Sequence, residues 1–141
     1  MLRSFALVAI LCLAGCASKP APVPYARAFP DDAPRAETLN IQIFQRETSV
    51  LLTNTTARAF GPSTLWLNMR FSRPLPSLAV GQTVELALRD FRDEFQDEFR
   101  GGGFFASEVP ERLVSAHLQP GSDQNPGAPL LGLVVVVNPA E

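Results

Sequence analysis

Side chains that could carry catalysis or bind a metal are scarce in this sequence. It has one histidine, His117, and two cysteines, Cys12 and Cys16. His117 could join Ser115 or Ser107 in a Ser-His-Asp arrangement, but no Gly-x-Ser-x-Gly motif is present to position a serine nucleophile. A zinc site needs three or four nitrogen, sulfur or oxygen ligands, and these residues supply no matching pattern. We therefore predict no catalytic residues, no metal site, no cofactor and no enzymatic activity.

The segment at residues 89–105 combines aromatic, acidic and basic side chains. Phe91, Phe95 and Phe99 recur at every fourth position, so a helix would place the three rings along one stripe. Three interpretations follow: a short element with its rings in the core, an aromatic patch that docks a partner together with Trp66, or an acidic site for a metal ion or small ligand. The acidic positions do not have the spacing of an EF-hand.

The N-terminus has the order of a secretory signal. Arg3 supplies a positive charge, and the apolar run at residues 4–13 is too short to span a bilayer. The run ends in Leu13-Ala14-Gly15-Cys16, which resembles the lipobox of bacterial lipoproteins: Leu, a small residue, Gly or Ala, then Cys. The resemblance implies cleavage between Gly15 and Cys16, a thioether-linked diacylglycerol on Cys16, and acylation of the new amine.

The lipobox resemblance also implies a location. Two or three acyl chains anchor a protein stably, so we expect a lipid-anchored protein of the cell envelope. Ala17 follows the cysteine where an aspartate would favour retention in the inner membrane, which favours the periplasmic face of the outer membrane. Two alternatives remain open: an ordinary signal peptide cut elsewhere, for example after Ala17, or an uncleaved anchor. In a lipoprotein, Cys12 leaves with the signal and Cys16 carries lipid, so no free thiol remains.

Composition and proline content predict the domain organisation. The chain has 141 residues and a net charge of −2, without the basic footprint of a nucleic-acid-binding protein. We expect a signal peptide at 1–15, a lipidated cysteine and proline-rich tether at 16–36, and a folded domain at 37–138. Prolines remove backbone donors and fix φ, so the tether should be extended and mobile, with a reach of about 50 Å. Its aromatics, Tyr25 and Phe29, could dock on another surface.

Alternating apolar and polar residues predict a mainly β domain. The pattern is clearest at residues 64–71, where Leu65, Leu67, Met69 and Phe71 should face the core and Trp66 the opposite side. Further strands are expected near residues 39–44, 49–53, 83–88, 112–118 and 130–137.

Short strands with turns at this spacing predict a small antiparallel β-sandwich with one short helix or turn near residues 89–100. Three stretches carry a resemblance to the immunoglobulin-like modules of bacterial envelope proteins: Val50-Leu51-Leu52-Thr53-Asn54-Thr55-Thr56, Thr64-Leu65-Trp66-Leu67-Asn68 and Leu78-Ala79-Val80-Gly81-Gln82-Thr83-Val84. The resemblance spans residues 38–90. The Cys-Trp-Cys core of true immunoglobulin domains is missing, and no catalytic residue is implied.

These patterns favour a membrane-anchored envelope lipoprotein that acts as a non-enzymatic binding or structural module. Its expected partners are the membrane, through lipid on Cys16, and an envelope protein. The alternative is a lipoprotein that binds a small ligand or metal ion through residues 89–105.

Overall fold

The computed structural model describes residues 21–137, so the predicted signal peptide and Cys16 lie outside the described residues. Seven strands and one 3-10 helix form the fold. They are β1 (Arg35–Gln45), β2 (Ser49–Thr53), β3 (Ser63–Leu67), β4 (Phe71–Leu75), β5 (Thr83–Ala87), η1 (Leu88–Asp90), β6 (Ala116–Pro120) and β7 (Leu130–Val136). The predicted mainly β class is confirmed.

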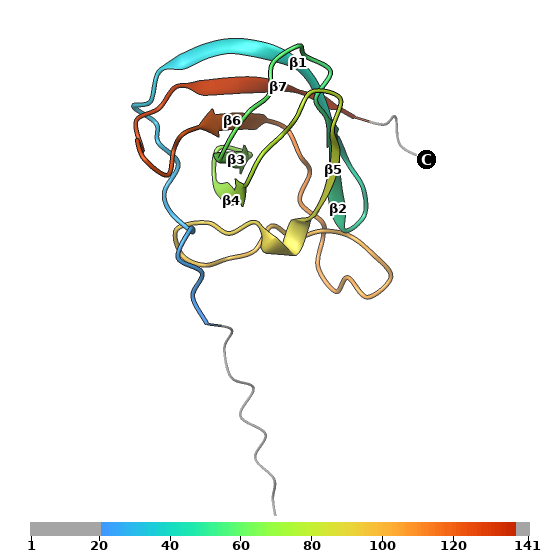
Figure 1. The fold of residues 1–141 in the computed structure, drawn as a ribbon. Helices are drawn as coiled ribbons and strands as arrows, with labels where there is room; N and C mark the ends of the chain where they lie inside the picture. The colour runs from blue at the N-terminus through green and yellow to red at the C-terminus, as the bar shows by residue number, and fades with distance from the viewer. Residues whose placement is uncertain (1–20, 138–141) are drawn as a thin grey trace, which may run out of the picture.

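The seven strands belong to one sheet, in the order β4-β3-β6-β7-β1-β2-β5. All neighbours are antiparallel except β1 and β7, which pair in parallel at the centre. The sheet curls so that its two edges turn toward each other (Figure 1). A sandwich of two separate sheets is therefore not confirmed, because the β1–β7 pairing joins the two halves.

The core fills the concave side of the curled sheet. Leu39, Ile41 and Ile43 of β1 are buried and alternate with exposed residues, as the sequence pattern predicts. Leu65 and Leu67 of β3 belong to the same core cluster. Both halves of the sheet thus contribute to this main core, while Ala33, Trp66 and Leu130 form a second, smaller cluster with Phe29 packed against it.

The strand predicted at residues 64–71 is instead a hairpin. β3 ends at Leu67, Asn68 and Met69 have φ of 53° and 52°, and the Arg70 N–H donates to the Leu67 carbonyl at 3.1 Å. Two consecutive positive φ values are the mark of a type I′ turn. Met69, predicted to lie in the core, is therefore at the turn and 50% exposed. Phe71 starts the return strand and is buried, as predicted.

The tether predicted to be mobile is packed against the fold over its described part. The Phe29 ring meets Trp66 edge-on at 5.2 Å, and the Arg27 guanidinium lies 5.4 Å from the Trp66 ring centre. The Tyr25 hydroxyl donates to the Asp90 carbonyl at 2.6 Å. Proline content correctly indicates irregular backbone, but the aromatic and arginine side chains bury enough surface to hold the segment in place.

Candidate functional site

Three of the four residues predicted as a partner patch are not on the surface. Trp66, Phe91 and Phe99 are buried, whereas Phe95 is 75% exposed. The helical stripe does not form, because η1 ends at Asp90 and the chain then folds into a compact loop. Phe91 and Phe99 face the core from the two ends of this loop, joined by a hydrogen bond from the Phe99 N–H to the Phe91 carbonyl. Phe95 is left at the tip.

Asp93 organises this 91–99 loop. One carboxylate oxygen accepts the backbone N–H groups of Phe95 and Asp97, each at 2.9 Å, and the other accepts two hydrogen bonds from Arg70 at 2.9 and 2.6 Å. Burial alone would raise the pKa of Asp93, but the hydrogen bonds from Arg70, Asp97 and Phe95 outweigh it and hold the pKa below its usual value. Both oxygens of the buried carboxylate are thus satisfied by the loop backbone and by Arg70.

The N-terminal segment leaves the fold beside this loop. The Val23 N–H donates to the side-chain oxygen of Gln96 at 2.8 Å, and the Gln96 amide returns a longer hydrogen bond to the Val23 carbonyl. Gln96 has a φ of 71°, and Phe95 immediately precedes it. The exposed Phe95 ring therefore lies at the same end of the molecule as Val23.

A second projection at this end is the finger, defined as residues 100–111. Its root is closed by a backbone hydrogen bond from the Glu111 N–H to the Arg100 carbonyl at 2.9 Å. The Arg100 guanidinium contacts the carboxylates of Glu108 at 3.0 Å and Glu111 at 3.4 Å. At the tip, Phe104 and Phe105 pack edge-to-face at 5.1 Å and are 95% and 93% exposed. The finger combines paired charges at its root with bare aromatic rings at its tip.

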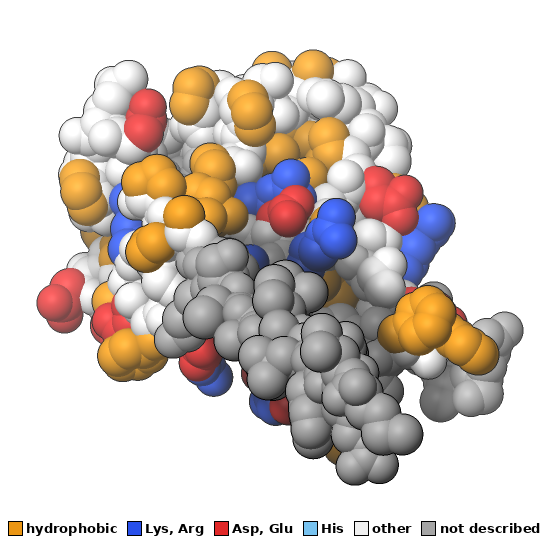
Figure 2. Space-filling model, turned by 90° about the horizontal axis from the view of Figure 1, so that it is seen from below, with side chains coloured by type: hydrophobic (Ala, Val, Ile, Leu, Met, Phe, Trp, Pro, Cys, Tyr) orange, Lys and Arg blue, Asp and Glu red, His pale blue; other side chains and the backbone are white. Residues whose placement is uncertain are grey.

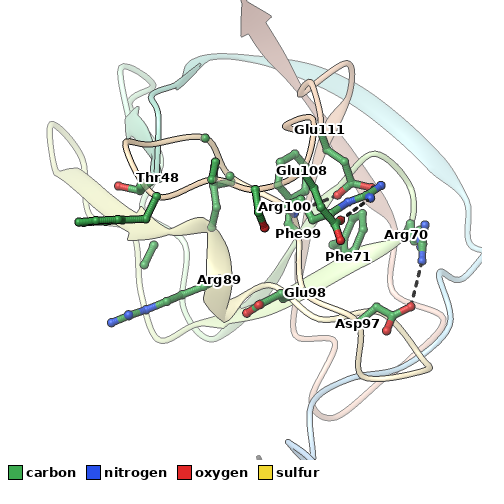
Figure 3. Close-up of a pocket in the computed structure, with 17 residues that line it drawn as sticks. Thr48, Arg70, Phe71, Arg89, Asp97, Glu98, Phe99, Arg100, Glu108 and Glu111 are labelled. Atoms are coloured by element: carbon green, nitrogen blue, oxygen red, sulfur yellow. Dashed lines mark hydrogen bonds and ion pairs between the residues drawn. The ribbon is translucent and has the colours of Figure 1, made fainter.

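A hollow of about 1010 Å³ lies between the finger and the 91–99 loop. Its lining includes the apolar side chains of Leu88, Phe71 and Phe99. Charged side chains such as Arg89 and Glu98 also line it (Figure 3). It overlaps the segment 89–105 that the sequence singled out. Among residues 21–137, no group of three histidine, cysteine or acidic side chains is placed to hold a metal ion.

His117 and Ser115 are not joined as a catalytic pair. Burial and, secondarily, the charge of Arg35 lower the pKa of His117. Neither the His117 Nδ1 nor the Ser115 hydroxyl has a hydrogen-bond partner in the described part of the chain, so the two do not bond to each other. His117 instead lies 5.9 Å from the Phe29 ring, beneath the packed N-terminal segment.

The polar side chains around Trp66 also fix structure. The Trp66 indole N–H donates to the Gln119 side-chain oxygen at 3.0 Å, and the Gln119 amide donates to the carbonyls of Pro126 and Ala128, each at 2.9 Å. This buried network ties β3 to the loop before β7. These three hydrogen bonds, and a fourth from the Arg27 guanidinium to the Gln119 side-chain oxygen at 3.4 Å, are all directed within the fold, so the network offers no group to a ligand.

Sequence reasoning missed the Asp93–Arg70 pair and the exposed finger tip. The first depends on a contact across 23 residues, which no local pattern reveals. The second did have a signal: Phe104-Phe105 stands between Gly101-Gly102-Gly103 and Ala106-Ser107, with no periodic apolar partner nearby.

No helix in residues 21–137 is long and apolar enough to cross a membrane. No family model, curated protein sequence or solved structure matches this chain.

Proposed function

We propose that the protein is a lipid-anchored lipoprotein of the cell envelope that serves as a binding or structural module rather than an enzyme. The observation that carries the proposal is the Leu13-Ala14-Gly15-Cys16 sequence at the end of a short apolar run. The lipid would be attached covalently to Cys16. Its acyl chains would insert in a membrane and hold the folded residues beside it.

The packing of the N-terminal segment supports an anchor that keeps the domain close to the membrane. The chain is attached to the fold from Val23 onward, through the contacts of Val23, Tyr25, Arg27 and Phe29. Cys16 precedes Val23 by seven residues. Fully extended, that connection reaches about 25 Å. This is half of the reach expected for a tether that is free up to Pro34.

Mass spectrometry of the mature protein tests the proposal. We expect a chain that begins at Cys16 and carries diacylglycerol with an acylated amine. Cys16→Ser should abolish the modification and release the protein from membranes into the soluble fraction. A mature chain with an unmodified Cys16, or one cut after Ala17, would refute the anchor.

The immunoglobulin-like resemblance is also a proposal, supported by strand order. Immunoglobulin domains place strands A, B and E in one sheet and C, F and G in the other. In chain order, β1, β2 and β5 take the places of A, B and E, and β3, β6 and β7 those of C, F and G. Register shifts in the pairing of β1 with β7 allow β1 to run along both halves of the sheet. An experimental structure with the halves packed face to face about 10 Å apart would support this; a hollow closed barrel would refute it.

The hollow favours a second candidate function, the binding of a small charged ligand. Asp97, Glu98 and Glu108 line it beside its apolar residues, and an added cation would compete with the arginines that pair with these carboxylates, Arg70, Arg92 and Arg100. Calcium is a direct probe, because a ligand that binds only the folded state raises the melting temperature by mass action. A saturable rise that is lost in Glu98→Gln would establish this second function. An unchanged melting temperature would exclude calcium as the ligand.

A further inference from the structure

Two exposed aromatic elements project from the end of the molecule where the N-terminal segment leaves the fold. The finger and the 91–99 loop both lie at the lower end in Figure 1, where the first described residues of the chain also lie. Seen from that side, hydrophobic side chains form separate patches between arginine and acidic groups (Figure 2). The finger carries Phe104 and Phe105 at its tip, and the 91–99 loop carries Phe95.

We propose that this end rests on a lipid bilayer, with Phe104 and Phe105 inserted among the lipid headgroups and upper acyl chains. The inference rests on the proposed anchor at Cys16. An anchored Cys16 places Val23 within about 25 Å of the membrane surface. Val23 is hydrogen-bonded to Gln96, directly beside Phe95. The aromatic end therefore lies within reach of the bilayer.

The composition of the finger suits contact with a bilayer. Its tip presents two large rings that no part of the described chain covers, and Val109, 84% exposed, adds to this apolar surface. The charges at its root are paired between Arg100 and the carboxylates of Glu108 and Glu111. Apolar side chains on a projecting element gain by leaving water for the interfacial layer, while paired charges can stay at headgroup level.

Site-directed spin labelling tests the inference in the lipidated full-length protein. A mature lipoprotein has no free thiol, because Cys12 is removed and Cys16 is acylated, so one introduced cysteine is labelled selectively. Phe105→Cys and Phe95→Cys place a nitroxide at the two projections. Val80→Cys is the matched control: Val80 is 56% exposed and precedes β5, whereas η1 follows β5, so the label sits at the opposite end of that strand.

The labelled protein is reconstituted into phosphatidylcholine vesicles, and collisions with oxygen and with a water-soluble nickel complex are compared. We expect the label at position 105 to show a several-fold higher oxygen-to-nickel ratio than the label at 80, with position 95 between them. The ratio should persist in 1 M salt, because apolar insertion is not screened. A ratio at 105 that falls to that at 80 in high salt would overturn apolar insertion.

The remaining outcomes separate this inference from the proposed function. A lipidated chain whose label at 105 is as accessible to nickel as the label at 80 refutes the inference and leaves the anchor standing. Mass spectrometry that finds Cys16 unmodified refutes both, because the short connection to the membrane no longer exists. A label at 105 in native membranes that is immobilised and shielded from both oxygen and nickel assigns the tip to a protein partner and overturns the bilayer contact.

Discussion

Asp93 is the side chain on which the 91–99 loop depends. A buried carboxylate is costly unless its oxygens are satisfied, and here two backbone N–H groups and the Arg70 guanidinium satisfy them. The hydrogen bonds that the Asp93 carboxylate accepts turn the chain at Gln96. Phe95 therefore points outward, while Phe91 and Phe99 stay in the core. A residue that the sequence groups with other solvated acids thus shapes the exposed end of the molecule.

Substitution of Asp93 separates its charge from its geometry. Asp93→Asn keeps an acceptor for Phe95 and Asp97 but loses the ion pair, and Asp93→Ala loses both. We expect Asp93→Ala to lower the free energy of unfolding by about 2–3 kcal/mol and Asp93→Asn by less, because the alanine leaves buried N–H groups unsatisfied. Urea denaturation measures both. Asp123→Asn, at an exposed site, is the control; equal losses for Asp93→Asn and Asp93→Ala would contradict the backbone role.

His117 makes the free energy of unfolding depend on pH below about 6.5. Burial lowers its pKa below the ordinary value of 6.5, so the folded state binds a proton less readily than the unfolded state. The free energy of unfolding is then greatest above pH 6.5 and falls as the pH drops through 6.5 toward the folded-state pKa. His117→Gln should flatten this fall. A mutant whose stability declines from pH 7 to pH 5 as steeply as the wild type's would refute the assignment.

At the scale of elements, the β3–β4 turn and the packed N-terminal segment are the features that the sequence predicts least well. The apolar alternation continues through Leu65, Leu67, Met69 and Phe71, so periodicity alone extends one strand across the turn. The turn is fixed by residues that are distant in the sequence. The Asn68 side-chain amide donates a hydrogen bond to the Arg112 carbonyl, and the Val114 N–H donates one to the Asn68 side-chain oxygen. Tertiary contacts of this kind override a local pattern.

Met69 is a strained residue at an exposed position. A non-glycine residue with φ of 52° is disfavoured, and type I′ turns prefer Asn-Gly, which Met69→Gly would create after Asn68. We expect Met69→Gly to raise the free energy of unfolding by about 1 kcal/mol, despite the added flexibility of the unfolded chain. Met69→Ala, which keeps the strain, should give no gain. Thermal denaturation of the three proteins is the measurement, and a destabilised glycine variant would argue against a type I′ turn.

The N-terminal segment can be followed through Trp66, the only tryptophan in the chain. Trp66 is buried partly because Phe29 covers it, so Phe29→Ala should shift its fluorescence to longer wavelength and increase quenching by acrylamide. The loss of partial burial and of the edge-to-face pair should cost about 1–2 kcal/mol. Tyr25→Phe, which removes only the hydrogen bond to Asp90, is the control and should leave the emission unchanged. Emission from Phe29→Ala identical to the wild type would contradict the packing.

At the scale of the whole molecule, the sequence predicts the class and most of the strands but not how the halves are joined. Alternation in β1 identifies its buried face correctly, because period two is a local property of a strand. The parallel pairing of β1 with β7 leaves no local trace. The same limit applies to the exposed end: Phe91, Phe95 and Phe99 read as equivalent, and only the loop geometry around Asp93 distinguishes them.

The pairing of β1 with β7 has a consequence for when the protein can fold. The first and last strands meet at the centre of the sheet, where Arg35 pairs with Leu130 and Phe44 with Val136. Long-range pairings of this kind form slowly, because the entropy cost of closing a large loop comes before any stabilising contact forms. A chain that emerges N-terminus first therefore cannot complete its sheet until nearly all of it has emerged. Until β7 is available, the half of the sheet that contains β6 stays unjoined to the half that contains β1.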